Sequence, residues 1–261
     1  MNRNHDTRFV KSDSIIDVDD VTPEKKKAML RTLLQILSRF KLDWKVIKAV
    51  MVTTGAVISG SAALAVLLEG EFVAQDLDIY VTGGHLGTVL VFLQEQGYNV
   101  TIPSPSTNKK NYPASTVALA LENNTGEKID LIATSEPHIV HAITKFHSTC
   151  VMNFIAYYGV VSLYPMWTMR KTALVRAGPI NQQAIDKYRG RGFAMVASAS
   201  DLPGYEPNHK CGTQLCCPMA RRQLHDDGTL CIPLEDDEWN IRTEEKMRVG
   251  WVLQKDPIGD E

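Results

Sequence analysis

The sequence predicts an α+β fold, in which a mixed, mainly antiparallel sheet is flanked by helices and followed by a Cys-rich C-terminal extension. Residues 76–81 alternate acidic and apolar side chains before becoming wholly apolar, which is the period of a half-buried strand. Residues 116–121 and 128–133 are two β-rich runs separated by an Asn-Asn-Thr-Gly turn, which predicts a hairpin. Apolar stripes at helical spacing lie before and between these strands.

Two packing helices are expected before the first strand. Met1–Val21 is charged and is expected to be a flexible arm. Thr22 is the expected N-cap of the first helix, with Pro23 at its first position. A second helix is expected over residues 42–53. The inward stripe of the first helix is formed by Met29, Leu33, Leu37 and Phe40.

The central elements are expected to follow as strand, helix and strand. A short β-branched run over 57–59 leads into a helix after Gly60-Ser61, and the acid-bearing strand covers 77–81. A helix is expected over 85–96, stopped by Gly97, and then a short strand and a polar loop. The helices are expected to pack on one face of the sheet.

The rest of the chain predicts four further helices and one strand. The expected helices cover residues 136–145, the apolar run 151–155 after a cap at Ser148 or Thr149, a short segment after 169–171, and residues 181–190. The strand is expected over 160–163. The predicted division is an arm over 1–21, one domain over 22–200, and the extension and tail over 201–261.

Composition favours an ordinary globular protein. The 261 residues are 44% hydrophobic and carry a net charge of −2, so bulk charge favours neither a nucleic-acid nor a membrane partner. No apolar run approaches the roughly 20 residues that span a bilayer, and the first residues lack a signal-peptide core. An intracellular location, cytoplasmic or nuclear, is therefore expected.

The chemistry is concentrated in residues 57–81. Asp76 and Asp78 lie on one face of the predicted strand, where two adjacent carboxylates repel each other unless a divalent cation offsets their charge. Gly60-Ser61 lies where a strand turns into a helix, and exposed backbone N–H groups make such a turn an anion site. A metal pair and a phosphate cradle are thus predicted within one unit.

This pattern resembles the nucleotidyltransferase superfamily of the DNA polymerase β type. The signature of that family is Gly followed by Gly or Ser, a helix, and Asp-x-Asp on a strand, here Gly60-Ser61 and Asp76-Leu77-Asp78. The family requires a third carboxylate on a neighbouring strand, for which Asp130 is the candidate. Over roughly residues 57–233 the chain is similar to nucleotidyltransferase-like proteins of mushroom-forming fungi.

The resemblance implies a nucleotidyltransferase fold and metal-dependent transfer of a nucleoside monophosphate from a nucleoside triphosphate, such as ATP, to a hydroxyl of RNA, protein or a small molecule. Asp76, Asp78 and Asp130 would hold Mg²⁺ (or Mn²⁺) and Gly60-Ser61 the phosphates. Nucleotide contacts are expected from His147, Ser148, Lys187 and Arg189. The alternative is a non-catalytic nucleotide- or partner-binding module that retains the fold. Each of the four nucleotide-contact candidates also has a competing structural role. Ser148 would cap a helix, and His147 would make a hydrogen bond within the protein. Lys187 and Arg189 would be cations favoured by the C-terminus of a helix.

The extension contains four of the five cysteines. Zinc prefers four thiolate or imidazole ligands supplied at short spacing. The candidate set for a structural zinc ion is His209, Cys216, Cys217 and Cys231. Buried free thiols are the competing interpretation.

Overall fold

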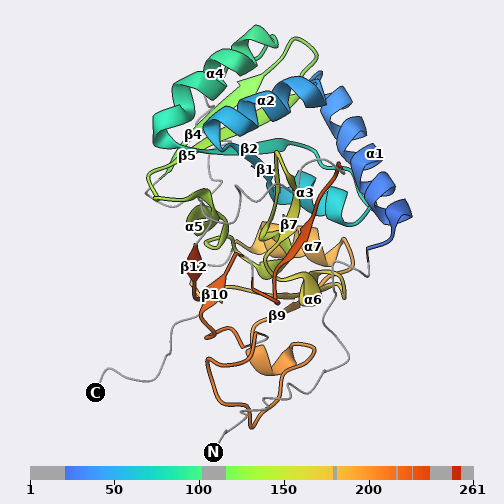
Figure 1. Cartoon of the computed structure of the whole chain (residues 1–261), viewed down its shortest axis with the longest axis vertical. Coiled ribbons are helices and arrows are strands. Elements are labelled where there is room, and N and C mark those ends of the chain that lie inside the picture. Colours follow the sequence, from blue (N-terminus) through green and yellow to red (C-terminus); the bar gives the residue numbers. More distant parts are fainter. Residues whose placement is uncertain are drawn as a thin grey trace, which may run out of the picture.

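The fold is described from a computed structural model, which covers residues 21–101, 116–178, 181–215, 217–224, 226–235 and 249–253 (Figure 1). The predicted arm over 1–21, apart from Val21, lies outside these residues. The helices are α1 (Pro23–Arg39), α2 (Trp44–Thr54), α3 (Gly60–Leu67), α4 (Leu86–Glu95), α5 (Ile139–Ile143), α6 (Pro165–Thr168) and α7 (Gln182–Arg189). The strands are β1 (Val57–Ser59), β2 (Leu77–Thr82), β3 (Asn99–Val100), β4 (Thr116–Glu122), β5 (Lys128–Thr134), β6 (Asn153–Ala156), β7 (Gly159–Ser162), β8 (Thr172–Leu174), β9 (Ala194–Val196), β10 (Arg222–Gln223), β11 (Leu230–Ile232) and β12 (Gly250–Trp251).

The main sheet confirms the predicted mixed, mainly antiparallel class. Its eight described strands have the order β11-β7-β6-β1-β2-β5-β4-β3. Only β2 and β5 pair in parallel among these neighbours, with Asp78 opposite Asp130. The predicted hairpin is formed by β4 and β5, and β1 pairs antiparallel with β2.

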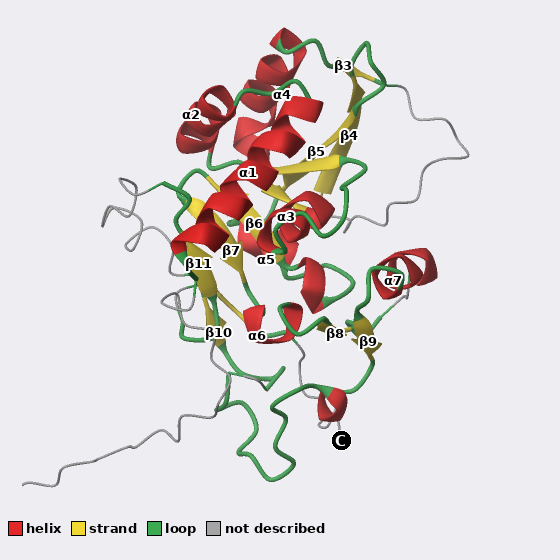
Figure 2. Ribbon diagram, turned by 90° about the vertical axis from the view of Figure 1, so that its right-hand side faces the viewer, coloured by secondary structure: helices red, strands yellow, loops and turns green. Residues whose placement is uncertain are grey.

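One face of the sheet carries the larger apolar core. Leu77 and Ile79 of β2 and Leu131 of β5 point into it and are almost fully buried. Helices α1, α2 and α4 gather on this side at the upper end of the molecule (Figure 2). Thr22 caps α1 through the backbone N–H of Lys25, as the sequence predicts. Because strand side chains alternate, the even-numbered residues of β2 and β5 face the opposite side.

The opposite face is also covered by helices, which goes beyond the prediction of helices packed on one face. Tyr80 and Ile132 pack there against α5, through residues such as Val140. Trp167 of α6 belongs to the same cluster. The loops that lead into these short helices have no sequence pattern that predicts their position. The helices cover only part of the face. Asp78 therefore lies at the border of the second core and is half-buried.

Three local predictions are wrong. The run 151–155 is not a helix: a 3₁₀ turn over Thr149–Val151 leads into β6, a strand buried between β1 and β7. A continuous apolar run does not distinguish a buried strand from a buried helix. The short helix near 169–171 precedes that segment as α6, and β8 follows. The helix expected over 136–145 is limited to α5, which His138 caps through Nδ1.

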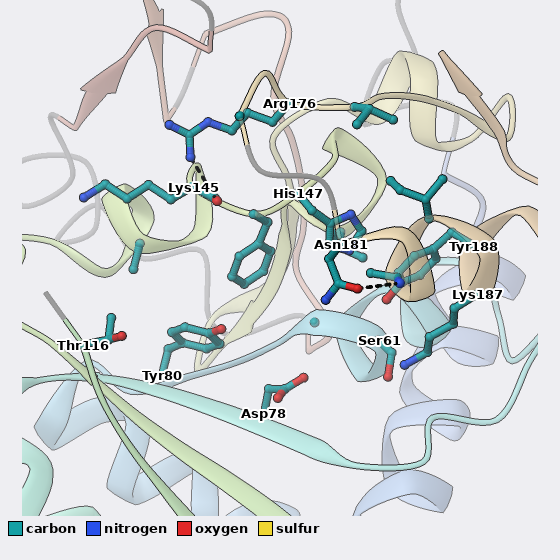
Figure 3. Close-up of a pocket in the computed structure, with 18 of the residues that line it drawn as sticks. Ser61, Asp78, Tyr80, Thr116, Lys145, His147, Arg176, Asn181, Lys187 and Tyr188 are labelled. Carbon is teal, nitrogen blue, oxygen red and sulfur yellow. Dashed lines mark hydrogen bonds between the residues drawn. The ribbon is translucent and has the colours of Figure 1, made fainter. Parts of the chain in front are cut away.

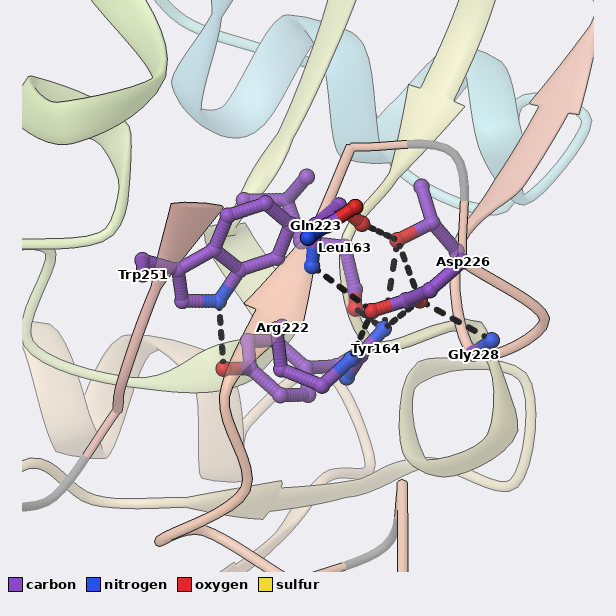
Figure 4. Close-up of polar contacts among 8 residues, drawn as sticks. Leu163, Tyr164, Arg222, Gln223, Asp226, Gly228 and Trp251 are labelled. Carbon is purple, nitrogen blue, oxygen red and sulfur yellow. Dashed lines mark hydrogen bonds and ion pairs between the residues drawn. The ribbon is translucent and has the colours of Figure 1, made fainter. Parts of the chain in front are cut away.

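The predicted extension contributes to the main sheet, because β11 pairs antiparallel with β7 at the sheet edge. A buried arginine holds the adjoining loop (Figure 4). Arg222 donates from Nε and Nη2 to the carboxylate of Asp226 at 2.7 and 2.8 Å, and from Nη2 to the Leu163 carbonyl at 3.2 Å. Its guanidinium lies 5.1 Å from the ring centre of Tyr164, whose hydroxyl accepts from Trp251 Nε1 at 2.9 Å.

None of the helices in the described ranges is both long and apolar enough to cross a membrane.

Candidate functional site

Three carboxylates converge at the edge between β2 and β5. Asp78 and Asp130 are partners in the parallel register, and Asp76 lies two residues before Asp78, on the same face. One carboxylate oxygen from each of the three lies within 4.8 Å of the others. All three side chains are half-buried. Oxygen ligands at this spacing are the donor set that Mg²⁺ and Mn²⁺ prefer.

Gly60 is fitted to this acidic cluster. Its φ of +64° lies in the left-handed region, where an L side chain is strained. A Cβ at this position would lie 2.2 Å from Asp78 Oδ2. The reason is the register of β1 and β2, which sets Ser59 opposite Asp78 and directs the next residue toward that carboxylate. The sequence predicts Gly60 for close approach to an anion, and the structure adds its closeness to Asp78.

Ser61 opens α3 beside the acids. Its side chain is buried, and its hydroxyl makes no hydrogen bond to any described residue. Buried hydroxyls are normally paired, so a buried hydroxyl that lines a cavity without a hydrogen bond to a described residue indicates a ligand or water partner. The cavity holds about 590 Å³ and is lined by Gly60, Ser61, Asp76 and Asp78 on one side.

The facing wall of the cavity is built from α5, the segment after β8, and α7 (Figure 3). Lys145 and Arg176 lie across the cavity from Asp78, and Lys187 of α7 reaches toward Ser61 (Figure 3). Lys145 forms an ion pair with Glu136, and Arg176 Nη1 donates to the Lys145 carbonyl at 3.0 Å. A cavity with carboxylates on one wall and cations on the other suits a metal-bound polyphosphate.

Two aromatic rings line the cavity. His147 and Tyr188 contact each other with ring centres 5.4 Å apart. Burial, and secondly the charge of Lys187, lowers the pKa of His147 to about 4, so its imidazole is neutral near pH 7. Burial is also the main cause that raises the pKa of Tyr188, and the neighbouring carboxylates add to it.

The structure brings most, not all, of the predicted site residues to the cavity. Gly60, Ser61, Asp76, Asp78, His147 and Lys187 line it, and Asp130 adjoins the two lining acids. Ser148 is fully buried instead, with its hydroxyl 3.3 Å from Cys150 Sγ, and Arg189 pairs with Asp186 on the exposed side of α7. Neither Ser148 nor Arg189 lines the cavity.

The cavity is also lined by three polar residues that the sequence did not predict as site residues, Lys145, Arg176 and Asn181. Asn181 lines the cavity and caps α7, accepting from the backbone N–H of Ala184 at 3.1 Å. The signal for Asn181 was its place at the start of an amphipathic segment. Lys145 and Arg176 stand in segments without a motif, and only the fold brings them to the acids.

The candidate zinc ligands are partly separated. Cys231 lies in β11 opposite Val161 and is buried among apolar side chains. His209, Cys211 and Cys217 gather in the extension, with one ligand atom from each within 4.8 Å of the others. Cys216 lies outside the described residues.

The sequence matches no protein-family model and no curated protein. Solved structures with a similar fold include a CCA-adding enzyme in its apo form, with a TM-score of 0.39 and 11% identity over 72% of this chain and 44% of that chain. The Thermotoga maritima CCA-adding enzyme complexed with tRNA gives 0.43 and 13% over 66% and 43%. A tRNA-processing enzyme gives 0.38 and 18% over 63% and 45%. The chain spans less than half the length of these proteins, so function has to be argued from the site.

Proposed function

We propose that this protein is a metal-dependent nucleotidyltransferase, which moves a nucleoside monophosphate from a nucleoside triphosphate to a hydroxyl acceptor. One observation carries the proposal: Asp76, Asp78 and Asp130 converge from adjacent strands beside the Gly60-Ser61 turn, at the wall of a cavity lined on its other side by cations. The resemblance to polymerase β-type enzymes and the similar folds of tRNA nucleotidyltransferases are consistent with it.

The donor set suits a divalent ion. Three carboxylates each offer an oxygen within 4.8 Å of the others, and Gly60 leaves the room that the Asp78 carboxylate needs. Asp76, Asp78 and Asp130 would hold Mg²⁺ or Mn²⁺. When bound, the ions would supply charge neutralisation at the phosphates and lower the pKa of an attacking hydroxyl.

The chain's own groups would bind and orient the substrate. The Ser61 hydroxyl and the N–H groups of the turn would donate to terminal phosphate oxygens. Lys187 and Arg176 would add positive charge along the polyphosphate. Asp130, the carboxylate on the second strand, would accept the proton of the acceptor hydroxyl. The neutral imidazole of His147 suits a hydrogen bond to the sugar or base better than a charge on phosphate.

The acceptor is proposed to be RNA, protein or a small molecule, in the order in which we would test them. The protein should be incubated with each labelled nucleoside triphosphate and Mg²⁺ or Mn²⁺, with RNA and protein pools. We expect label transfer and pyrophosphate release. Asp78→Asn should abolish label transfer and pyrophosphate release, because it removes a proposed metal ligand. The fold should be kept, because the change relieves clustered negative charge. Asp186→Asn, an exposed acid on α7, is the matched control and should stay active.

Three outcomes would decide against the enzyme. Full activity of Asp78→Asn would exclude the proposed metal role. Mg²⁺-dependent nucleotide binding without any pyrophosphate release, across all acceptors, would identify the non-catalytic binding module instead. No calorimetric binding of any common nucleoside triphosphate, with or without Mg²⁺, would reject both.

A further inference from the structure

A second group of metal-ligating side chains lies in the extension, outside the cavity. His209, Cys211 and Cys217 each offer one ligand atom, and these atoms lie within 4.8 Å of one another. The Sγ atoms of Cys211 and Cys217 are 3.6 Å apart. That separation is far longer than a disulfide bond of about 2.05 Å. It is close to the edge of a zinc tetrahedron, which is about 3.8 Å for Zn–S bonds of about 2.3 Å.

The His209 ring is oriented as a metal ligand requires. Its Nδ1 contacts the carbonyl oxygen of Glu206, and because a carbonyl can only accept, Nδ1 carries the proton. In the neutral ring the lone pair is then on Nε2. That atom is buried, and the side-chain partner of the ring is the sulfur of Cys217, itself a member of the group. A ligating histidine typically donates its other N–H to a carbonyl in this way.

The backbone around the thiols is arranged for thiolate sulfur. Gly212, with a φ of +80°, directs its N–H to Cys217 Sγ at 3.4 Å. Cys217 N donates to the Gln214 carbonyl at 2.8 Å, and Ala220 N to the Cys217 carbonyl at 2.9 Å, which fixes the tight turns on either side. N–H donors to sulfur stabilise its negative charge and orient it toward a metal.

The same stretch has little else to hold it. Its described residues between 203 and 221 form turns and bends, without a helix or a strand. The buried apolar residues there are few, Cys217 and Ala220 among them. Such loop-rich segments are usually stabilised by a disulfide or a metal ion.

We propose that His209, Cys211 and Cys217 bind one Zn²⁺ ion, which holds the loop of residues 206–219 in its folded form. Binding replaces two S–H bonds with two S–Zn bonds and releases two protons to solvent, without electron transfer. Three protein ligands leave one position of the tetrahedron for water or a further donor. Cys231 is excluded from the site because it lies in the main sheet. The proposal is independent of the activity proposed above.

The test uses the untagged full-length chain carrying Asp78→Asn, so that the acidic cluster does not contribute to the metal count. After reconstitution with Zn²⁺ and removal of excess, elemental analysis should give about one zinc per chain. His209→Ala and Cys211→Ser should each weaken zinc affinity at least ten-fold. Cys231→Ala is the matched control, since it also removes one thiol, and it should retain zinc. Co²⁺ in place of Zn²⁺ should show thiolate charge-transfer absorption that weakens in Cys211→Ser.

A second measurement needs no change at the ligands. In the parent chain, alkylation of the exposed thiol of Cys211, mapped by mass spectrometry, should be slow with Zn²⁺ and fast after chelation. Equal zinc content in Cys211→Ser and the parent, or equal alkylation with and without zinc, would overturn the site. A Cys211–Cys217 disulfide that persists in reductant would also overturn it. Because Met219 Sδ lies 3.2 Å from Cys211 Sγ, Cu(I) is titrated in parallel, and tighter binding of Cu(I) would overturn the assignment of zinc.

Discussion

Replacing Gly60 by Ala should damage the acidic cluster more than the fold. The new Cβ would lie 2.2 Å from Asp78 Oδ2, and ordinary contact begins at 3.4 Å, so the carboxylate must retreat by about 1.2 Å (3.4 − 2.2). Displacing a catalytic group by about 1 Å can cost about 100-fold in rate. A φ of +64° adds about 1–2 kcal/mol of backbone strain. At about 2–4 °C per kcal/mol, the melting temperature should fall by about 2–8 °C.

The measurement compares Mn²⁺ affinity, by electron paramagnetic resonance, with thermal unfolding. Gly55→Ala is the matched control, because Gly55 has a φ of +67° and nothing within 4 Å of an added Cβ. It should lose similar stability through strain and keep its Mn²⁺ affinity. Gly60→Ala should lower the melting temperature less when Asp78 is also replaced by Ala, because the steric conflict is then gone and only the backbone strain persists. If Gly60→Ala and Gly55→Ala have the same Mn²⁺ affinity and the same melting temperature, the close approach of Gly60 and Asp78 does not contribute to metal binding.

Three further outcomes are expected. Ser61→Ala should weaken calorimetric binding of a non-hydrolysable nucleoside triphosphate by about ten-fold to a hundred-fold, since a hydrogen bond to a charged group contributes about 1.5–3 kcal/mol. Ser162→Ala, which removes another buried unpaired hydroxyl, should leave that binding unchanged. The free energy of unfolding should fall as pH drops from about 6.5 to 4, by roughly 3 kcal/mol, because His147 binds a proton in the unfolded state at higher pH than in the folded state. His147→Gln should reduce this change in the free energy of unfolding with pH. If urea unfolding at several pH values gives the same change for His147→Gln as for the parent, the role of His147 is contradicted. Asp226→Ala should cost about 3–5 kcal/mol in urea unfolding, because it leaves the buried Arg222 charge without its carboxylate.

The acidic cluster could be predicted from sequence because its determinants are local. Strand periodicity places Asp78 on the face opposite Ile79, and the short hairpin places Asp130 on a neighbouring strand. The parallel pairing of β2 with β5 then aligns the two acids side by side. What periodicity cannot give is pairing between distant strands, and β6 was therefore mistaken for a helix.

The facing wall could not be predicted, because its geometry depends on how distant segments pack. Ser148 illustrates the difficulty. A helix after Ser148 would have left its hydroxyl as an exposed cap, but the chain makes a 3₁₀ turn and pairs Ser148 with Val175. The serine is thereby buried, and the same segment brings Arg176 to the cavity, where its backbone N–H donates to the His147 carbonyl. Because a helix was predicted after Ser148, Ser148 was expected at the cavity, where it does not lie, and Arg176 was not expected there, where it does lie.

The two halves of the proposed site depend on one glycine. Because Ser59 is opposite Asp78 in the register of β1 and β2, the residue that begins α3 must face that carboxylate. Any side chain there would push Asp78 away from Asp76 and Asp130, and glycine also adopts the left-handed turn that starts α3 without the strain of an L side chain. In the proposed function, the glycine that would give a phosphate access to the turn is therefore also the glycine that lets the carboxylates assemble. A substitution at position 60 should therefore weaken the proposed anion binding and the proposed cation binding together, whereas a substitution of Ser61 or Asp78 should weaken one of them.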